Sequence, residues 1–177
     1  HGTNCRVGFV TNRAADGQPE MLRMAGSRGL RRKEPADAEA MRNNTYWFPW
    51  TLAGVDNLLS ALFAGGHQTA ILYGEVFGSG IQSYTYGQKS IAFRAFDLLV
   101  DGKFLDYDAF VACCAEHAVA TVPLAYRGPF SLSTIKQLSD GASLVGGKEG
   151  REGVVVKPVQ ERQDAKIGRV ILKYVGD

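Results

Sequence analysis

Hydrophobic and polar positions change their spacing along the chain, and these changes mark out strands and helices. Residues 5–11 alternate loosely and contain β-branched side chains, which predicts a strand, and a polar turn leads to a second short strand at residues 21–24. Residues 52–63 place leucine and valine on one helical face, and Gly65 and Gly66 follow as a C-cap. The first part of the chain is therefore predicted to contain a hairpin and an amphipathic helix.

The remaining apolar segments predict further strands, with two helices between them. Strand character is found at residues 69–77, 91–100, 153–157 and 169–175. Helical patterns lie between the second and third of these, at residues 108–118 and 132–139, the latter with Ser131 or Ser133 as its N-cap. An order of strands, inserted helices and strands again favours an α+β fold with largely antiparallel β-sheets and flanking helices.

The composition is that of one soluble globular domain over residues 1–177. With 177 residues, of which 45% are hydrophobic and 21% charged, the chain can bury one sizeable core. Its formal net charge of +2 permits a polyanionic partner without requiring one. No apolar run is long enough to cross a membrane, and the start lacks the features of a signal peptide. The three cysteines have no zinc-binding spacing, which indicates a reduced, cytoplasmic protein.

Two conspicuous groups are better explained by packing than by chemistry. The aromatic cluster at residues 46–50 is broken by a proline before an amphipathic helix, a pattern more typical of local core than of an RNA-stacking platform. Cys113 and Cys114 are adjacent on a predicted helix, where neighbouring side chains diverge by roughly 100°. We expect structural roles for both groups.

Charged residues within apolar strands are the first candidates for chemistry. Glu75 lies in an apolar strand between two glycines, Glu152 precedes another, and Lys173 stands alone in the last strand. A charge in such a context needs a partner, although an outward-facing Glu75 on an edge strand is the alternative. The two carboxylates are expected at the ends of neighbouring strands. Together with an aromatic residue such as Phe96, they form a group able to surround one bound nucleotide.

Six short motifs occur in a fixed order along the whole chain. They are HGTN at residues 1–4, SRG at 27–29, YGEVFG at 73–78, FRAFD at 93–97, EGVVVK at 152–157 and ILK at 171–173. Each is weak alone, but their order resembles the ordered motifs of the covalent nucleotidyltransferases, which include DNA ligases, RNA ligases and messenger-RNA capping enzymes. The resemblance implies a nucleotidyltransferase domain of the ATP-grasp-like kind found in DNA and RNA ligases.

Within that group the residues of the motifs resemble those of ATP-dependent RNA ligases. DNA ligases typically have an acidic residue where His1 stands and an arginine where Asn4 stands, whereas HGTN is similar to the RNA-ligase form. The pair Ile81-Gln82 and Arg151 also resemble RNA ligases. The resemblance implies ATP, held as AMP, and Mg²⁺ or Mn²⁺ as cofactors.

The resemblance also implies residues that bind the nucleotide. Asn4 is expected to position the phosphate, Arg28 to contact the ribose and phosphate region, and Glu75 to accept a hydrogen bond from a ribose hydroxyl. Phe96 is expected to stack on adenine, a contact worth roughly 1–3 kcal/mol. Phe93 is the alternative stacking residue, because the strand register is uncertain from sequence. A solvated basic loop for Arg28 and a core position for Phe96 are the competing interpretations.

Catalytic roles are implied for three further positions. Glu152 is expected to hold the divalent ion, with Glu75 as a second metal-binding candidate, both through water. Lys173 is expected to neutralise the α-phosphate, with Lys157 as a further phosphate contact. His1 occupies a motif position near the reacting phosphate. The family often has two lysines separated by one residue in the last motif. The single Lys173 can match either of them, so its alignment can differ by two positions.

The nucleophilic lysine is expected two residues upstream of His1 and is absent from this chain. We therefore expect the domain to be truncated at its N-terminus, with truncation at the C-terminus open. The implied activity is the sealing of 5′-phosphate and 3′-hydroxyl RNA ends through lysyl-AMP and RNA-adenylate intermediates. RNA ends are the expected partner, with an accessory RNA-binding domain in the parent chain, no membrane, and a monomer favoured. The alternatives are a DNA ligase or guanylyltransferase of the same superfamily, and a catalytically degenerate nucleotide- or RNA-binding module.

Overall fold

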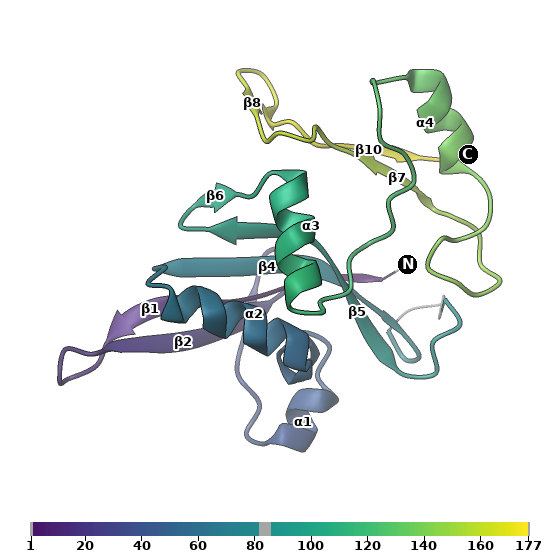
Figure 1. Cartoon of the computed structure of the whole chain (residues 1–177). Helices are drawn as coiled ribbons and strands as arrows, with labels where there is room; N and C mark the ends of the chain where they lie inside the picture. The colour runs from purple at the N-terminus through teal and green to yellow at the C-terminus, as the bar shows by residue number, and fades with distance from the viewer. Residues whose placement is uncertain (1, 82–85, 177) are drawn as a thin grey trace.

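A six-stranded antiparallel sheet forms the centre of the computed structural model, which describes residues 2–81 and 86–176 (Figure 1). Its strands are β1 (Thr3–Arg13), β2 (Pro19–Gly26), β3 (Arg31–Arg32), β4 (Thr69–Gly78), β5 (Ile91–Val100) and β6 (Lys103–Phe104). They lie in the order β3-β2-β1-β4-β5-β6, and every neighbouring pair is antiparallel. The predicted α+β class with antiparallel sheets is confirmed.

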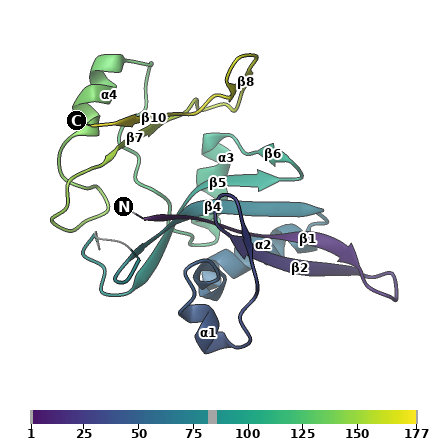
Figure 2. The same ribbon diagram turned by 180° about the vertical axis from the view of Figure 1, so that it is seen from behind.

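The two faces of this sheet differ in character. Along β1, the side chains of Cys5, Val7 and Phe9 are fully buried on one face, while Asn4 and Arg6 project from the other. Helices α2 (Ala53–Ala64) and α3 (Tyr107–Glu116) cover the buried face, as the two opposite views show (Figures 1 and 2). The second face is therefore left available for a site.

The aromatic cluster before α2 belongs to the core, as predicted. It spans the 3-10 helix η1 (Phe48–Thr51), which follows the short helix α1 (Ala38–Arg42). Trp47 is 1% exposed and Trp50 3%, and their indole N–H groups donate to the carbonyls of Arg32 and Met24. Each buried ring thus has its polar atom satisfied, and the cluster ties the helices to β2 and β3.

A smaller unit at the C-terminal end packs beside the main sheet (Figure 1). In it, β7 (Gly153–Val156) pairs with β10 (Leu172–Val175), and helix α4 (Leu132–Ser139) lies against both strands. The two-residue strands β8 (Gln163–Asp164) and β9 (Gly168–Arg169) form a hairpin between them. Glu75 is therefore on β4 of the main sheet, whereas Glu152 immediately precedes β7 of the smaller one, and the expectation of neighbouring strands was wrong.

The helix predictions agree closely with the structure, and the strand predictions only in part. Helix α2 ends at Gly65 as predicted, and Ser131 is the N-cap of α4, its hydroxyl accepting from the Thr134 amide. The predicted strand at residues 169–175 is divided into β9 and β10. None of the helices in the described part of the chain is both long and apolar enough to cross a membrane.

Candidate functional site

A cavity of ≈310 Å³ opens on the uncovered face of the main sheet, where β1, β4 and β5 meet the C-terminal unit. Its lining residues are Asn4, Arg6, Arg28, Tyr73, Phe96, Asp97, Phe104, Arg169 and Ile171. A volume of this order is at the lower end of the range for small-molecule sites. Three of the sequence-predicted residues, Asn4, Arg28 and Phe96, thus lie around one space.

Strand register explains why these side chains share a face. Asn4 of β1 lies opposite Glu75 of β4, and Arg6 lies opposite Tyr73. Tyr73 in turn lies opposite Asp97 of β5. Because side chains directly across an antiparallel pair project to the same side, the three strands form one continuous polar surface. Glu75 does not line the cavity itself but stands beside Asn4 at its edge.

A β-bulge sets the position of Phe96. The register between β4 and β5 shifts between Tyr73 and Gly74, so that Phe96 has no partner residue on β4. The extra residue lets the consecutive side chains of Phe96 and Asp97 both reach the cavity, which regular alternation would prevent. Phe93 is instead 5% exposed and part of the hydrophobic core. The structure therefore places Phe96, and not the alternative Phe93, at the site.

Asp97 is the centre of a buried ionic network. Its side chain is 3% exposed and accepts from Lys157 Nζ at 2.7 Å and from both terminal nitrogens of Arg169 at 2.9 Å. Lys157 also donates to the carbonyl of Phe96 at 2.8 Å. Arg169 pairs with Glu161 as well. Lys157, predicted as a phosphate contact, is thus held by Asp97 and by the backbone of Phe96.

Arg169 stays cationic in this network although it is partly buried. Burial opposes its charge, but the hydrogen bonds that it donates to Glu161 and Asp97, and the negative charges of both, outweigh that effect and raise the pKa of Arg169 above its ordinary value. The guanidinium also lies 3.6 Å from the ring centroid of Phe104, and Phe104 packs against Tyr73 with centroids 5.6 Å apart. One wall of the cavity is therefore a stack of two rings and a fixed cation.

Two further cations line the cavity. Arg6 projects from β1, and Arg28 comes from the turn after β2. Among residues 2–81 and 86–176, neither has a carboxylate within ion-pair distance. Since Arg169 is balanced by Asp97, the charge in excess at the cavity is positive, which suits an anionic ligand.

Glu152 and Lys173 form a pair outside this cavity. Lys173 Nζ donates to Glu152 Oε1 at 3.2 Å, and the two side chains are 57% and 43% exposed. Lys173 lies on β10 opposite Val155, and Glu152 immediately precedes β7. Arg151 fixes this point of the chain by donating to the carbonyls of Leu138 and Ala142. The structure thus brings Glu152 and Lys173 together, and neither side chain lines the cavity that Asn4, Arg28 and Phe96 share.

Two sequence-predicted positions lie outside the described residues, namely His1 and Gln82. The residues missed by sequence reasoning are Arg6, Tyr73, Asp97, Phe104, Arg169 and Ile171. Tyr73, Asp97 and Ile171 belong to quoted motifs, where they received no role. Arg6 follows Asn4 by two positions, so period-2 alternation along β1 was a usable signal for it.

The carboxylates of Glu75 and Glu152 are suitable ligands for a divalent ion that also binds substrate phosphates. Within the described ranges no group of three or more His, Cys, Asp or Glu side chains is placed to hold a metal. Mg²⁺ is commonly held by one or two carboxylates together with water and substrate phosphates. Glu75 and Glu152 supply carboxylates of that kind, so the donor set is compatible with an ion carried in with a nucleotide.

Comparisons with known proteins agree on one family. The family model described as RNA ligase matches residues 1–175. A lysine-to-alanine mutant of the Naegleria gruberi RNA ligase with ATP and Mn is 20% identical, with a TM-score of 0.67 over 99% of this chain and 50% of that chain. The same enzyme with PPi gives the same values. No curated protein matches the chain. At this identity the structures show the fold alone, and the chain spans about half their length.

Proposed function

Because the chain belongs to the RNA ligase family, we propose that it is the adenylation domain of an ATP-dependent RNA ligase. The cofactors are ATP, held as AMP, with Mg²⁺ or Mn²⁺. This is supported by the Naegleria gruberi structures, which contain ATP with Mn, AMP with Mn, and PPi. The parent protein is proposed to carry an accessory RNA-binding domain, in keeping with the greater length of those relatives. A cytoplasmic monomer remains our prediction.

The observation that carries the proposal is the meeting of Asn4, Arg28 and Phe96 around one cavity of ≈310 Å³. A nucleoside monophosphate needs an aromatic face for its base and cations for its phosphate, and the cavity offers both. Phe96 stacks on adenine, since the bulge turns its ring toward the cavity. Arg28 binds the ribose and phosphate region through its planar fork. Glu75, beside Asn4, accepts from a ribose hydroxyl.

The proposed reaction has three displacements at phosphorus. A lysine of the parent protein attacks the α-phosphate of ATP and pyrophosphate leaves. The 5′-phosphate of one RNA end then takes the AMP and frees the lysine. Finally the 3′-hydroxyl of the other end attacks that phosphate, AMP leaves, and a phosphodiester is formed. Each displacement thus has a good leaving group.

The residues of this chain contribute position and charge to these steps. Asn4 orients the transferred phosphate, and Lys173 neutralises the charge that develops on it. Lys157 holds the strand that carries Phe96 through its bond to the Phe96 carbonyl, and it is proposed as a further phosphate contact. Glu152 and Glu75 would hold the divalent ion through water. When bound, that ion offsets phosphate charge.

Labelling of the parent protein with radioactive ATP tests the proposal. We expect a covalent adduct with ATP and not with GTP, and sealing of nicked RNA in preference to nicked DNA. The parent sequence should have a lysine two residues before His1. A parent protein with that lysine that forms no adduct, or one that accepts only GTP, would refute the assignment. A parent without the lysine that still binds ATP would be a binding module.

A further inference from the structure

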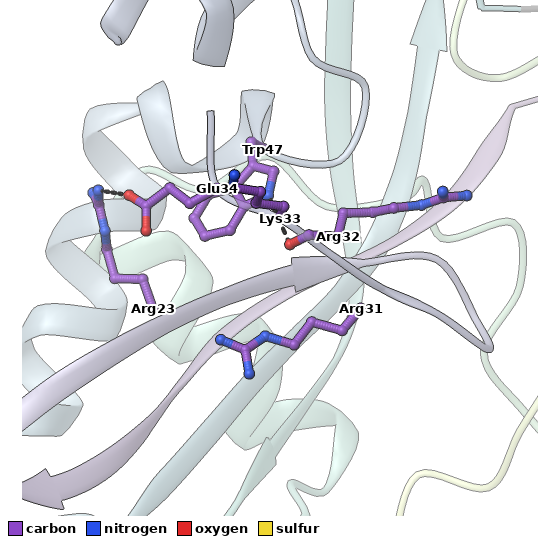
Figure 3. Close-up of a pocket in the computed structure, with 6 residues that line it drawn as sticks. All are labelled: Arg23, Arg31, Arg32, Lys33, Glu34 and Trp47. Atoms are coloured by element: carbon purple, nitrogen blue, oxygen red, sulfur yellow. Dashed lines mark hydrogen bonds and ion pairs between the residues drawn. The ribbon is translucent and has the colours of Figure 1, made fainter. Parts of the chain in front are cut away.

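A second cavity, of ≈350 Å³, lies at the β3 edge of the main sheet (Figure 3). Its lining residues are Arg23, Arg31, Arg32, Lys33, Glu34 and Trp47. Four of these six side chains are cationic and one is acidic. The cavity of ≈310 Å³ that is proposed to bind the nucleotide is called the nucleotide cavity below. The second cavity shares no lining residue with it.

The positive charge here is only partly balanced. Glu34 pairs with Arg23, as the dashed line in Figure 3 shows. Across the part of the chain that the structure describes, the side chains of Arg31, Arg32 and Lys33 have no carboxylate within ion-pair distance. Arg31 and Arg32 project to opposite faces of β3, and their guanidinium groups point in different directions (Figure 3). With Lys33 they give the edge of the sheet an excess of about three positive charges, which favours an anionic partner.

The backbone that carries these cations is fixed. The indole Nε1 of Trp47, itself 1% exposed, donates to the Arg32 carbonyl at 3.2 Å. Arg32 pairs with Ala25 across β2 and β3, and its guanidinium lies 5.0 Å from the ring centroid of Tyr46. The cations are therefore presented from an ordered strand that packs on the core, which lowers the entropy cost of binding.

The same segment connects the two cavities. Arg31 lies opposite Gly26, and Gly26 lies opposite Arg6, which lines the nucleotide cavity. Arg28 lines that cavity too and lies in the turn closed by the bond from the Ser27 amide to the Leu30 carbonyl at 3.0 Å. A run of cations therefore leads from the nucleotide cavity around the edge strand to the second cavity.

We propose that Arg31, Arg32 and Lys33, which we call the edge cations, bind the phosphodiester backbone of the RNA strand whose end is joined at the nucleotide cavity. The proposal rests on the proposed function and adds the path that the strand follows. A backbone carries a regular line of phosphates, which matches a line of cations better than a single anion does. Arginine forks suit phosphate oxygens, so the contact is independent of base sequence.

The reach of the segment sets the length of RNA that is needed. Residues 28–33 extend at most about 18 Å, and one strand carries a phosphate every ~3.4 Å of helix axis. The edge cations should therefore contact phosphates within roughly five nucleotides of the joined end. Arg31 lies two strands from Arg6, a backbone separation of about 10 Å, so oligonucleotides of one or two residues are too short to span it.

The test compares two triple variants of the 177-residue chain. The first replaces the edge cations by Arg31→Gln, Arg32→Gln and Lys33→Gln. The second, a matched control that removes two arginines and a lysine from exposed sites elsewhere, carries Arg13→Gln, Lys136→Gln and Arg162→Gln. The Kd for a 5′-phosphorylated RNA of about twelve nucleotides is measured between about 50 and 200 mM KCl, and the Kd for ATP with Mn²⁺ is measured in parallel.

We expect the edge variant to bind the RNA at least about tenfold more weakly at low salt, and the control to stay within about twofold. Each phosphate contact contributes about 0.7 to the slope of log K against log salt for a single strand, so the slope should fall by about 2. The Kd for ATP should not change. A 5′-phosphorylated dinucleotide should bind the edge variant and the unaltered chain equally.

Equal RNA affinity in the edge and control variants, or an unaltered chain that binds no RNA, would overturn the proposal. Loss of affinity for poly-glutamate with unchanged affinity for RNA would also overturn it, and would assign the surface to an acidic protein partner. The two proposals fail separately. If the unaltered chain binds no ATP and the edge variant still loses RNA affinity, the proposed function is refuted, but the RNA-binding role of the edge cations stands.

Discussion

Each terminal nitrogen of the Arg169 guanidinium lies 2.9 Å from a different carboxylate oxygen of Asp97. The two residues belong to different sheets, since Asp97 is on β5 and Arg169 on β9. Both also line the nucleotide cavity. This bidentate pair therefore holds the C-terminal unit against the main sheet at the point where the nucleotide is proposed to bind.

Asp97→Ala should destabilise the fold strongly. It leaves Lys157 and Arg169, each with a side chain 18% exposed, without their shared carboxylate. Breaking a buried ion pair from one side costs about 3–5 kcal/mol, and we expect the lower end because both cations retain some access to water. Urea unfolding measures the loss. Asp97→Asn, which keeps an acceptor oxygen, should lose less, and a loss below about 1 kcal/mol for Asp97→Ala would contradict the assigned network.

Phe96→Ala should weaken ATP binding without unfolding the protein. Loss of base stacking costs roughly 1–3 kcal/mol, which corresponds to about a 5- to 150-fold rise in the Kd for ATP with Mn²⁺. Calorimetric titration with ATP and Mn²⁺ measures this Kd. Phe130→Ala is the matched control, because that ring is 68% exposed and does not line the cavity.

Phe93→Ala should behave in the opposite way. Phe93 is 5% exposed in the core, where truncation of a phenylalanine costs about 3–5 kcal/mol. The protein should lose stability while the remaining folded fraction keeps its affinity for ATP. If Phe93→Ala and not Phe96→Ala selectively weakened ATP binding, the strand register at the site would be wrong.

The contrast between these two phenylalanines shows how far sequence alone reaches. Motif order indicated that the FRAFD segment provides a stacking ring, but the choice between Phe93 and Phe96 depended on which face of β5 the core covers, and no local pattern states that. The bulge that brings Asp97 to the same face as Phe96 has no local signal either. Arg6 followed from alternation along β1 and was nevertheless missed. Arg169 and Phe104 come from two-residue strands, which are too short for any periodicity, and they reach the cavity only through tertiary packing.

Long-range pairing also explains the one clear error in the fold. Glu75 and Glu152 were expected on neighbouring strands because each lies at an apolar β-branched run. Nothing in such a run says which sheet it joins, and β7 pairs with β10 in a separate sheet. The helices were predicted well because their periodicity and caps are local signals, as Ser131 at the start of α4 illustrates.

Gly74→Ala should displace the bulge and with it Phe96. A Cβ at Gly74 would collide with the Phe93 ring and the Arg94 carbonyl. Overpacking of this kind costs about 1–3 kcal/mol, and relief by a shift of β5 would move the neighbouring Phe96. We expect both a lower urea midpoint and weaker ATP binding. Gly29→Ala is the control, since its Cβ would meet nothing within 4 Å. If Gly74→Ala were destabilised but kept its affinity for ATP, the bulge would not be needed to position Phe96 for binding.

Asp101 should make the stability depend on pH in the acid range. A hydrogen bond from His67, together with the backbone amides of Thr69 and Gln68, lowers the pKa of Asp101 below its ordinary value. A carboxyl group with a lowered folded-state pKa stabilises the fold above its unfolded pKa, near 3.9, and that contribution is lost as the pH falls through the folded value. The stability advantage over Asp101→Asn should therefore be full near pH 5 and shrink toward pH 2.

Asparagine is a suitable replacement because Asp101 has a φ of 49°, a conformation that asparagine also tolerates. Urea midpoints of both proteins between pH 2 and 5 provide the measurement. An advantage that grew as the pH fell would have the wrong sign for a lowered pKa and would exclude the hydrogen bonds as its cause.

Glu152→Ala and Lys173→Ala should separate catalysis from stability. The pair is half exposed, and exposed ion pairs contribute about 0–1 kcal/mol, so the urea midpoint should hardly change. In the parent protein, loss of a charge that is proposed to act on the reacting phosphate should slow formation of the lysyl-AMP adduct by about 10²–10³-fold. Single-turnover labelling with ATP measures that rate.

The pair Asp108 and Arg127 is the matched control, with side chains 64% and 48% exposed. Asp108→Ala and Arg127→Ala should leave both the urea midpoint and the adduct rate nearly unchanged, because the pair is exposed and neither residue lines the cavity. An adduct rate in Lys173→Ala equal to that in Arg127→Ala would mean that Lys173 does not act on the α-phosphate. Loss of stability in Lys173→Ala alone would instead make it a structural residue of the small sheet, whose partner strand carries Val155 opposite it.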